Sequence, residues 1–161
     1  MPEAFVGIGS NVDPQRALRA AVAALERLGT VRCSSVYRSA AVGGVGVDYL
    51  NIVAALTTSL SVAALRDALH AIEAEAGRRR LDPAACELDL DLLLYGVRVD
   101  AGERLPRPKL FTLPFVLGPL AELAPELAHP LTGESARAAR QAAGPAALAA
   151  LEKLGPVRSL A

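Results

Sequence analysis

The chain has 161 residues, 52% of them hydrophobic, and its 17 Lys and Arg balance 17 Asp and Glu to a formal net charge of zero. This length predicts one domain over 1–161 with a substantial core, and the balanced charge gives no support for nucleic acid or an anionic membrane as a partner. No hydrophobic run is long enough to span a bilayer, no signal peptide is visible, and two cysteines are too few for a disulfide framework. We expect a cytoplasmic protein, monomeric rather than oligomeric.

Hydrophobic periodicity predicts strands and helices that alternate along the first part of the chain. In chain order these are a strand at 4–9, a helix at 13–29, a strand at 31–37, a strand at 49–58, a helix at 61–77 and a strand at 87–95. The first helix is expected to have Asp13 as its N-cap and Pro14 at its first position. The order β-α-β-β-α-β is that of the ferredoxin-like α+β fold with an antiparallel sheet.

The remaining residues are expected to extend this core with helix. A Pro-rich connection leads to a short Leu/Ala helix around 117–123, which completes a core of about 4–130. An Ala-rich tail of about 134–161 follows and is broken at Gly144-Pro145. The sequence has no evident internal repeat or second domain.

The strand at 87–95 has the most informative pattern, because leucines alternate with carboxylates. The leucines are Leu88, Leu90, Leu92 and Leu94, and the carboxylates are Glu87, Asp89 and Asp91. Side chains repeat every two residues along a strand, so the leucines face the core and the carboxylates share the other face. Asp is depleted in strands and like charges at this spacing repel, so this face is costly unless a cation offsets it. Mg²⁺ fits, because it binds one or two carboxylates together with waters or substrate phosphates. An ordinary solvated polar face is the alternative, and spacing alone does not decide between them.

Short motifs in a fixed order carry a resemblance to one known family. They are 5–11 (FVGIGSN), 37–39 (YRS), 48–51 (DYLN), 72–73 (IE), 77–80 (GRRR), 88–93 (LDLDLL), 115–117 (FVL) and 119–125 (PLAELAP). In this order and spacing they resemble the 6-hydroxymethyl-7,8-dihydropterin pyrophosphokinase family over about residues 4–130. The Leu-Asp-Leu-Asp element with the preceding Gly-Arg-x-Arg is the specific part, whereas the Gly-Ser-Asn start alone would be weak.

The resemblance implies an enzyme of folate biosynthesis that transfers pyrophosphate from ATP to the hydroxymethyl group of the pterin and releases AMP. It implies that Asp89 and Asp91 bind two Mg²⁺ ions that bridge the nucleotide phosphates, with Arg78 as a further catalytic residue. Paired metals of this kind clamp the attacking and leaving oxygens and neutralise charge on the transferred group. The residues that it assigns to ATP are Glu73, Arg78, Arg80, Arg104 and Arg107.

The same resemblance implies a pterin pocket. Tyr49 and Phe115 would stack on the two faces of the ring, Asn51 would hydrogen-bond its amide edge, and Ser39 and the Val42 backbone would line the pocket. Each of these residues also has a purely structural interpretation. The two aromatic residues are equally typical of a core. Asn51 could cap a turn, and Glu73 could form an ion pair with a neighbouring Arg. The arginines at 78–80 could lie at a helix C-terminus, whose dipole favours cations.

Several positions depart from the family pattern. The loop before the acidic strand is about two residues shorter and lacks the family Trp, while the family Arg and Thr that follow it fall on Cys86 and Glu87. The family His falls on Arg107, and an Arg two residues before the family Phe falls on Leu113. Losing a cation that acts on transition-state charge costs several orders of magnitude in rate.

Two functional interpretations therefore remain. The first is a working pyrophosphokinase, favoured by the Asp89/Asp91 pair and by Arg78. The second is a catalytically degenerate relative that binds a pterin or nucleotide without turnover. A ferredoxin-like RNA-binding module fits poorly, because the chain is only 4% aromatic and formally neutral.

Overall fold

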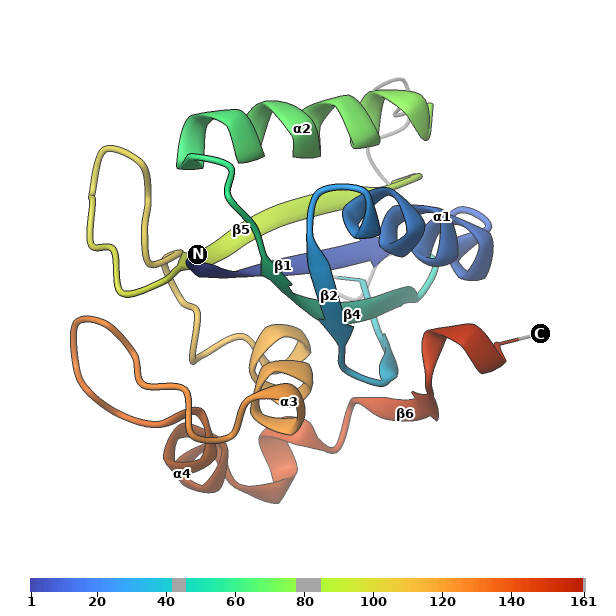
Figure 1. Cartoon of the computed structure of the whole chain (residues 1–161). Helices are drawn as coiled ribbons and strands as arrows, with labels where there is room; N and C mark the ends of the chain where they lie inside the picture. Colours follow the sequence, from blue (N-terminus) through green and yellow to red (C-terminus); the bar gives the residue numbers. More distant parts are fainter. Residues whose placement is uncertain (42–45, 78–84, 161) are drawn as a thin grey trace.

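An antiparallel sheet crosses the middle of the structure, a computed structural model that describes residues 1–41, 46–77 and 85–160 (Figure 1). Within the described residues its strands are β1 (Glu3–Ser10), β2 (Thr30–Cys33), β3 (Val36–Ser39), β4 (Tyr49–Thr57), β5 (Asp89–Tyr95) and β6 (Glu152–Gly155). Their order across the sheet is β5-β1-β4-β3-β6, and β2 pairs with the end of β4 that β3 leaves uncovered. The sheet therefore has β1 and β4 at its centre and β5 at one edge.

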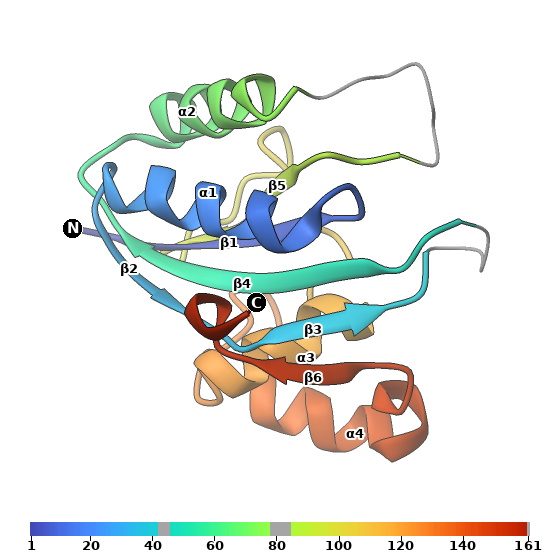
Figure 2. The same ribbon diagram turned by 90° about the vertical axis from the view of Figure 1, so that its right-hand side faces the viewer.

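Helices cover both faces of this sheet (Figure 2). The first pair, α1 (Pro14–Glu26) and α2 (Val62–Glu75), packs on one face, and its apolar residues form a core with alternate residues of β1, β4 and β5. On the opposite face α3 (Pro114–Leu123) packs against the other set of alternate residues, and α4 (Ala136–Leu148) packs on α3. None of the helices in the described part of the chain is long and apolar enough to cross a membrane.

The element order β1-α1-(β2,β3)-β4-α2-β5 confirms the ferredoxin-like α+β prediction, with one difference in the expected second strand. The residues expected at 31–37 form two strands, because Ser34 interrupts the backbone ladder. Its N–H donates to the Val53 carbonyl at 2.9 Å, while its hydroxyl accepts from the Val53 N–H at 3.0 Å. A buried hydroxyl thus takes the place of a backbone carbonyl, and the chain bends between β2 and β3.

A β-bulge in β5 corrects the prediction that its four leucines share one face. Phe5 pairs with Leu94 and Val6 pairs with Leu92, so Leu93 is an extra residue in β5. Bulges change which way the following side chains point. Leu88, Leu90 and Leu92 therefore pack towards α1 and α2 as expected, but Leu94 packs with Phe5 in the core under α3.

The starts of the helices agree only in part with the expected caps. Pro14 is the first residue of α1 and Asp13 is its N-cap, but Asp13 has a φ of 43° and its side chain makes no capping hydrogen bond. At α2 and α4 the N-cap serines do accept such bonds, Ser61 from the Ala64 N–H and Ser135 from the Ala138 N–H. The third helix, expected around 117–123, begins earlier, at Pro114.

The C-terminal tail contains more than the predicted helix. Its helix α4 kinks at Gly144, where φ is 75°, and the chain then returns to the sheet as β6, which pairs with β3. A short 3-10 helix, η1 (Val157–Ser159), follows and packs beside α1. The tail thus completes the sheet edge that the ferredoxin-like core leaves open.

Candidate active site

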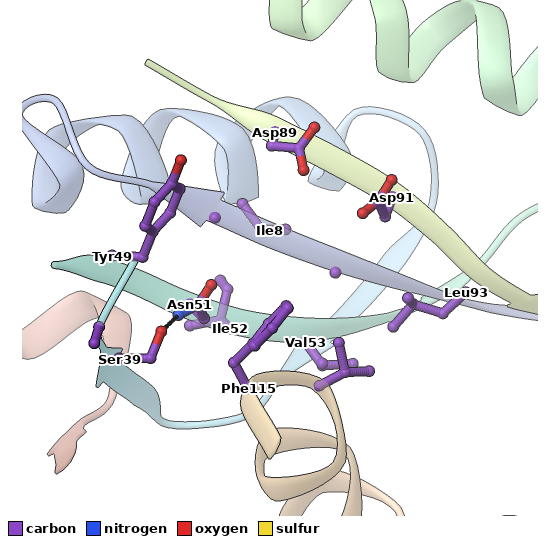
Figure 3. Close-up of a pocket in the computed structure, with 14 residues that line it drawn as sticks. Ile8, Ser39, Tyr49, Asn51, Ile52, Val53, Asp89, Asp91, Leu93 and Phe115 are labelled. Atoms are coloured by element: carbon purple, nitrogen blue, oxygen red, sulfur yellow. Dashed lines mark hydrogen bonds between the residues drawn. The ribbon is translucent and has the colours of Figure 1, made fainter. Parts of the chain in front are cut away.

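A cavity of about 190 Å³ opens on the α3 face of the sheet, next to the N-terminal end of α3 (Figure 3). It is lined by Gly7, Ile8, Gly9, Ser39, Ala40, Tyr49, Asn51, Ile52, Val53, Asp89, Asp91, Leu93, Phe115 and Val116. These residues come from β1, β3, β4, β5 and α3, together with Ala40 directly after β3. Six of the predicted site residues, Ser39, Tyr49, Asn51, Asp89, Asp91 and Phe115, therefore meet in one place.

Two glycines of β1 form the floor of the cavity. Gly9 lies opposite Asp89 on one side and Asn51 on the other, and Gly7 lies opposite Asp91 and Val53. A Cβ on Gly9 would come within 3.1 Å of the Asn51 Oδ1. Glycine inside a strand weakens it and often marks a place where a ligand approaches the backbone closely. The spacing of these two glycines, both on the face away from α1 and α2, was a signal that sequence reasoning missed.

A buried hydrogen bond fixes the amide on the wall of the cavity. The Asn51 Nδ2 donates to the Ser39 Oγ at 2.8 Å, and both residues are less than a tenth exposed. This bond orients the amide so that Oδ1 faces the floor at Gly9. Asn51 is therefore placed to accept hydrogen bonds from N–H groups of a ligand, and it does not act as a turn cap.

The two predicted stacking residues lie on different sides of this amide. Tyr49 begins β4 and Phe115 is near the start of α3, and Figure 3 shows Asn51 between them. Both are only partly buried, and Tyr49 belongs to neither core cluster, while Phe115 packs against the edge of the core under α3. Burial raises the pKa of the Tyr49 hydroxyl, and the neighbouring Cys86 and Asp89 raise it further. The rings of Tyr49 and Phe115 thus line the same cavity as the two glycines.

The carboxylates of Asp89 and Asp91 line the side of the same cavity that β5 forms. Burial raises the pKa of Asp91 above its usual range, and the charge of Asp89 raises it further, while Arg107 and Arg104 act in the opposite direction. The Arg107 Nη1 lies 3.0 Å from the Asp91 Oδ1. Negative charge is thus concentrated here, at a place where a cation is favoured.

This donor set fits a magnesium site that is completed by a substrate. Within the described residues no three His, Cys, Asp or Glu side chains form a metal-binding group. Mg²⁺ commonly uses one or two carboxylates together with waters and substrate phosphates, so the Asp89 and Asp91 pair is sufficient. Glu87, the third carboxylate of the predicted row, precedes β5 and is not part of the cavity lining.

Glu73 and two arginines lie around the carboxylates. Glu73 is 5% exposed, and its Oε1 accepts the Leu90 N–H at 2.7 Å, which holds α2 to the edge strand β5. Arg104 and Arg107 belong to the segment after β5, and the Arg107 N–H donates to the Leu93 carbonyl at 2.9 Å. Arg104 is exposed, with a φ of 54°. Binding of ATP by these residues stays a prediction.

The Ser10-Asn11 pair at the end of β1 has a role that the sequence did not reveal. The Ser10 hydroxyl donates to the Glu87 carbonyl at 2.6 Å, and the Asn11 Oδ1 accepts the Cys86 N–H at 2.6 Å. Together they join the end of β1 to the residues that precede β5. The pair therefore fixes the position at which Asp89 enters the site. In the sequence, two polar residues at the end of an apolar strand were the signal that could have predicted this contact.

The remaining predicted positions divide into two groups. Val42, Arg78 and Arg80 lie outside the described residues. Leu113 is the N-cap residue of α3 and packs against the core under that helix, so this position makes an apolar contact.

Comparisons with known proteins find relatives with a common name. The chain is 42% identical over 139 residues to the 2-amino-4-hydroxy-6-hydroxymethyldihydropteridine pyrophosphokinase of Synechocystis. This alignment covers 82% of this chain and 71% of the relative. The protein of the same name from Haemophilus influenzae is 40% identical over 138 residues, 81% of this chain and 86% of the relative.

Solved structures show the same fold. An HPPK-DHPS in complex with substrates aligns with a TM-score of 0.76 at 10% identity and covers 95% of this chain. A Plasmodium falciparum HPPK-DHPS aligns with a TM-score of 0.72, also at 10% identity and 95% coverage. This chain spans 46% and 47% of those two chains, less than half of each. With a family match over residues 5–125, the chain belongs to the 7,8-dihydro-6-hydroxymethylpterin-pyrophosphokinase (HPPK) family.

Proposed function

We propose that this chain transfers pyrophosphate from ATP to the hydroxymethyl group of 6-hydroxymethyl-7,8-dihydropterin, giving the pterin diphosphate and AMP in folate biosynthesis. One observation carries the proposal: a single cavity combines a glycine floor, two aromatic rings and an oriented amide with a pair of carboxylates. A binding site for a planar heterocycle is therefore next to a site for a metal-bound phosphate chain. Transfer between two substrates requires this proximity.

The pterin ring is assigned to the space between Tyr49 and Phe115, against Gly9. Aromatic stacking on both faces orients a planar ring at low entropic cost, since the side chains are already in place. The Asn51 Oδ1, held by Ser39, accepts a hydrogen bond from the N–H groups of the ring. Val42 is assigned to the same pocket. This arrangement directs one edge of the ring into the cavity and leaves the hydroxymethyl group towards the carboxylates.

The nucleotide is assigned to the side of the cavity that β5 forms. Asp89 and Asp91 would hold two Mg²⁺ ions, which supply charge neutralisation for the transferred group and its leaving oxygen. Arg78, Arg80, Arg104 and Arg107 are assigned to the phosphates, where guanidinium groups bind oxygens in a bidentate manner. Glu73 is assigned to the nucleotide side and also anchors β5. The same proposal includes a cytoplasmic monomer of one domain with no nucleic-acid partner.

The alternative, a degenerate binder without turnover, is less well supported. Its premise is the loss of cations at Cys86 and Leu113. Arg107, however, supplies a permanent cation 3.0 Å from Asp91, and the carboxylate pair and the oriented amide are both present. The amide would serve a pterin binder equally well, but pterin binding alone requires neither the carboxylate pair nor a cation beside it.

The two interpretations differ in their products. We expect the full chain, incubated with ATP, Mg²⁺ and 6-hydroxymethyl-7,8-dihydropterin, to form AMP and the pterin diphosphate, both observed by phosphorus NMR. Without the pterin, AMP should not accumulate. Pterin binding by calorimetry without AMP formation would establish the degenerate binder, and ADP as the product would contradict pyrophosphate transfer.

A further inference from the structure

The carboxylate of Asp91 has two possible partners, the guanidinium of Arg107 and a metal ion. The Arg107 Nη1 lies 3.0 Å from the Asp91 Oδ1, and both side chains are 35% exposed. The same carboxylate oxygen belongs to a residue assigned to metal binding. A carboxylate oxygen in close contact with a guanidinium binds a divalent cation less strongly, because the two positive groups compete for the same oxygen and repel one another.

The backbone of Arg107 is held firmly, although its side chain is long. Its N–H donates to the Leu93 carbonyl, two residues along β5 from Asp91. The turn before it is closed by paired bonds between Asp100 and Leu105, at 2.8 and 2.9 Å, and by Arg66 of α2, which donates to the Glu103 carbonyl. The backbone of Arg107 is therefore fixed beside Asp91, and the guanidinium moves only as far as the flexible side chain of Arg107 allows.

We propose that Arg107 is an exchangeable counter-ion of Asp91. Its guanidinium holds the carboxylate until the metal and nucleotide arrive, and it then leaves Asp91 for a phosphate oxygen of the nucleotide. This inference rests on the proposed function, since it needs Asp91 to be a metal ligand.

Charge explains why the exchange is favourable. Asp89 and Asp91 repel one another on the same face of β5, and a guanidinium reduces that repulsion before a metal is present. Once a divalent cation neutralises the carboxylates, the guanidinium loses its advantage at Asp91. A phosphate chain then offers a stronger, bidentate partner within reach.

The exchange predicts effects of opposite sign on metal and nucleotide. Removing the guanidinium frees Asp91, so metal binding without nucleotide becomes tighter, while nucleotide binding becomes weaker because a phosphate contact is lost. Partly exposed ion pairs change binding constants by up to about fivefold, and charge-assisted hydrogen bonds by about tenfold or more. A residue with a merely structural role would not move the two affinities in opposite directions.

The test uses the full chain and Mn²⁺ as the metal probe, followed by calorimetry or electron paramagnetic resonance. Arg107→Gln should bind Mn²⁺ about three- to fivefold more tightly than wild type without nucleotide. In saturating Mn²⁺ the same variant should bind a non-hydrolysable ATP analogue about tenfold more weakly. Arg32→Gln is the matched control, because Arg32 also forms a 3.0 Å ion pair, with Glu3 of β1, and neither residue lines the cavity. It should leave both affinities unchanged.

A third variant separates failure of this inference from failure of the proposed function. If Asp91→Asn binds Mn²⁺ as wild type does, the metal assignment is wrong and the inference fails with it. If Asp91→Asn loses Mn²⁺ but Arg107→Gln shows no tighter binding, the metal site stands and the counter-ion role is overturned. Unchanged affinity of Arg107→Gln for the analogue would also overturn the exchange.

Discussion

Asp91→Asn should abolish Mg²⁺-dependent binding of an ATP analogue while the fold stays intact. The amide keeps the shape of the side chain but removes the charge and one oxygen that a divalent cation requires. We expect a loss of at least about a hundredfold in affinity, since outer-shell changes alone already cost ten- to a hundredfold. Calorimetry with the analogue in the presence of Mg²⁺ measures it. Asp67→Asn, on the exposed side of α2, is the control and should bind as wild type does.

The same substitution should raise thermal stability at neutral pH. Burial and the charge of Asp89 hold the Asp91 pKa above its unfolded value, so the folded chain binds that proton more tightly than the unfolded chain does. The ionised carboxylate is therefore unfavourable above the folded pKa, and Asn removes it. The advantage of Asp91→Asn should shrink as the pH falls through the pKa of Asp91, because wild type then becomes neutral as well. A lower melting temperature at pH 7 would contradict this account.

Phe115→Ala should weaken pterin binding by about ten- to a hundredfold, because stacking of a heterocycle on an aromatic side chain is worth about 1–3 kcal/mol. The ring of Phe115 lines the cavity opposite Tyr49, and no other aromatic side chain among the described lining residues is placed to replace it. Fluorescence titration with 6-hydroxymethyl-7,8-dihydropterin measures the loss.

Phe111→Ala provides the matched control for that result. Phe111 packs against the same core under α3, but it does not line the cavity. Its ring meets the His129 ring edge-on, with the two ring centroids 5.1 Å apart. It should lose stability without losing pterin affinity. Equal affinities for the two variants would place the pterin elsewhere.

Much of the fold was predictable because local patterns and the core agree. The alternation of Leu88, Leu90 and Leu92 with Asp89 and Asp91 survives in the structure, since one face of β5 is buried and a slip of one residue would bury the carboxylates. The periodicity of the first two helices likewise matches their buried faces. Local sequence was sufficient wherever one face of an element packs on the core.

The features that were missed depend on contacts distant in sequence. The bulge at Leu93 arises from pairing with β1, and the break at Ser34 arises from its bonds to Val53 of β4. The strand β6 forms because β3 leaves an edge open, which nothing in residues 152–155 indicates. No local pattern contains information about these partners.

The candidate site was predictable to the extent that the family motifs carry it. Tyr49, Asn51 and Phe115 come together from two elements, as the resemblance implied. The Arg107 contact with Asp91 could not be foreseen, because it depends on how the turn at 100–105 closes.

In the function that we propose, one cavity holds both the metal-bound phosphates and the pterin. The most direct measurement is a crystal structure of the full chain with Mn²⁺, a non-hydrolysable ATP analogue and 6-hydroxymethyl-7,8-dihydropterin, using the anomalous signal of Mn²⁺ to locate the metal. We predict Mn²⁺ bound by Asp89 and Asp91, and the pterin ring between Tyr49 and Phe115 with its amide edge at Asn51. Metal bound away from both carboxylates, or a pterin outside this cavity, would contradict the account.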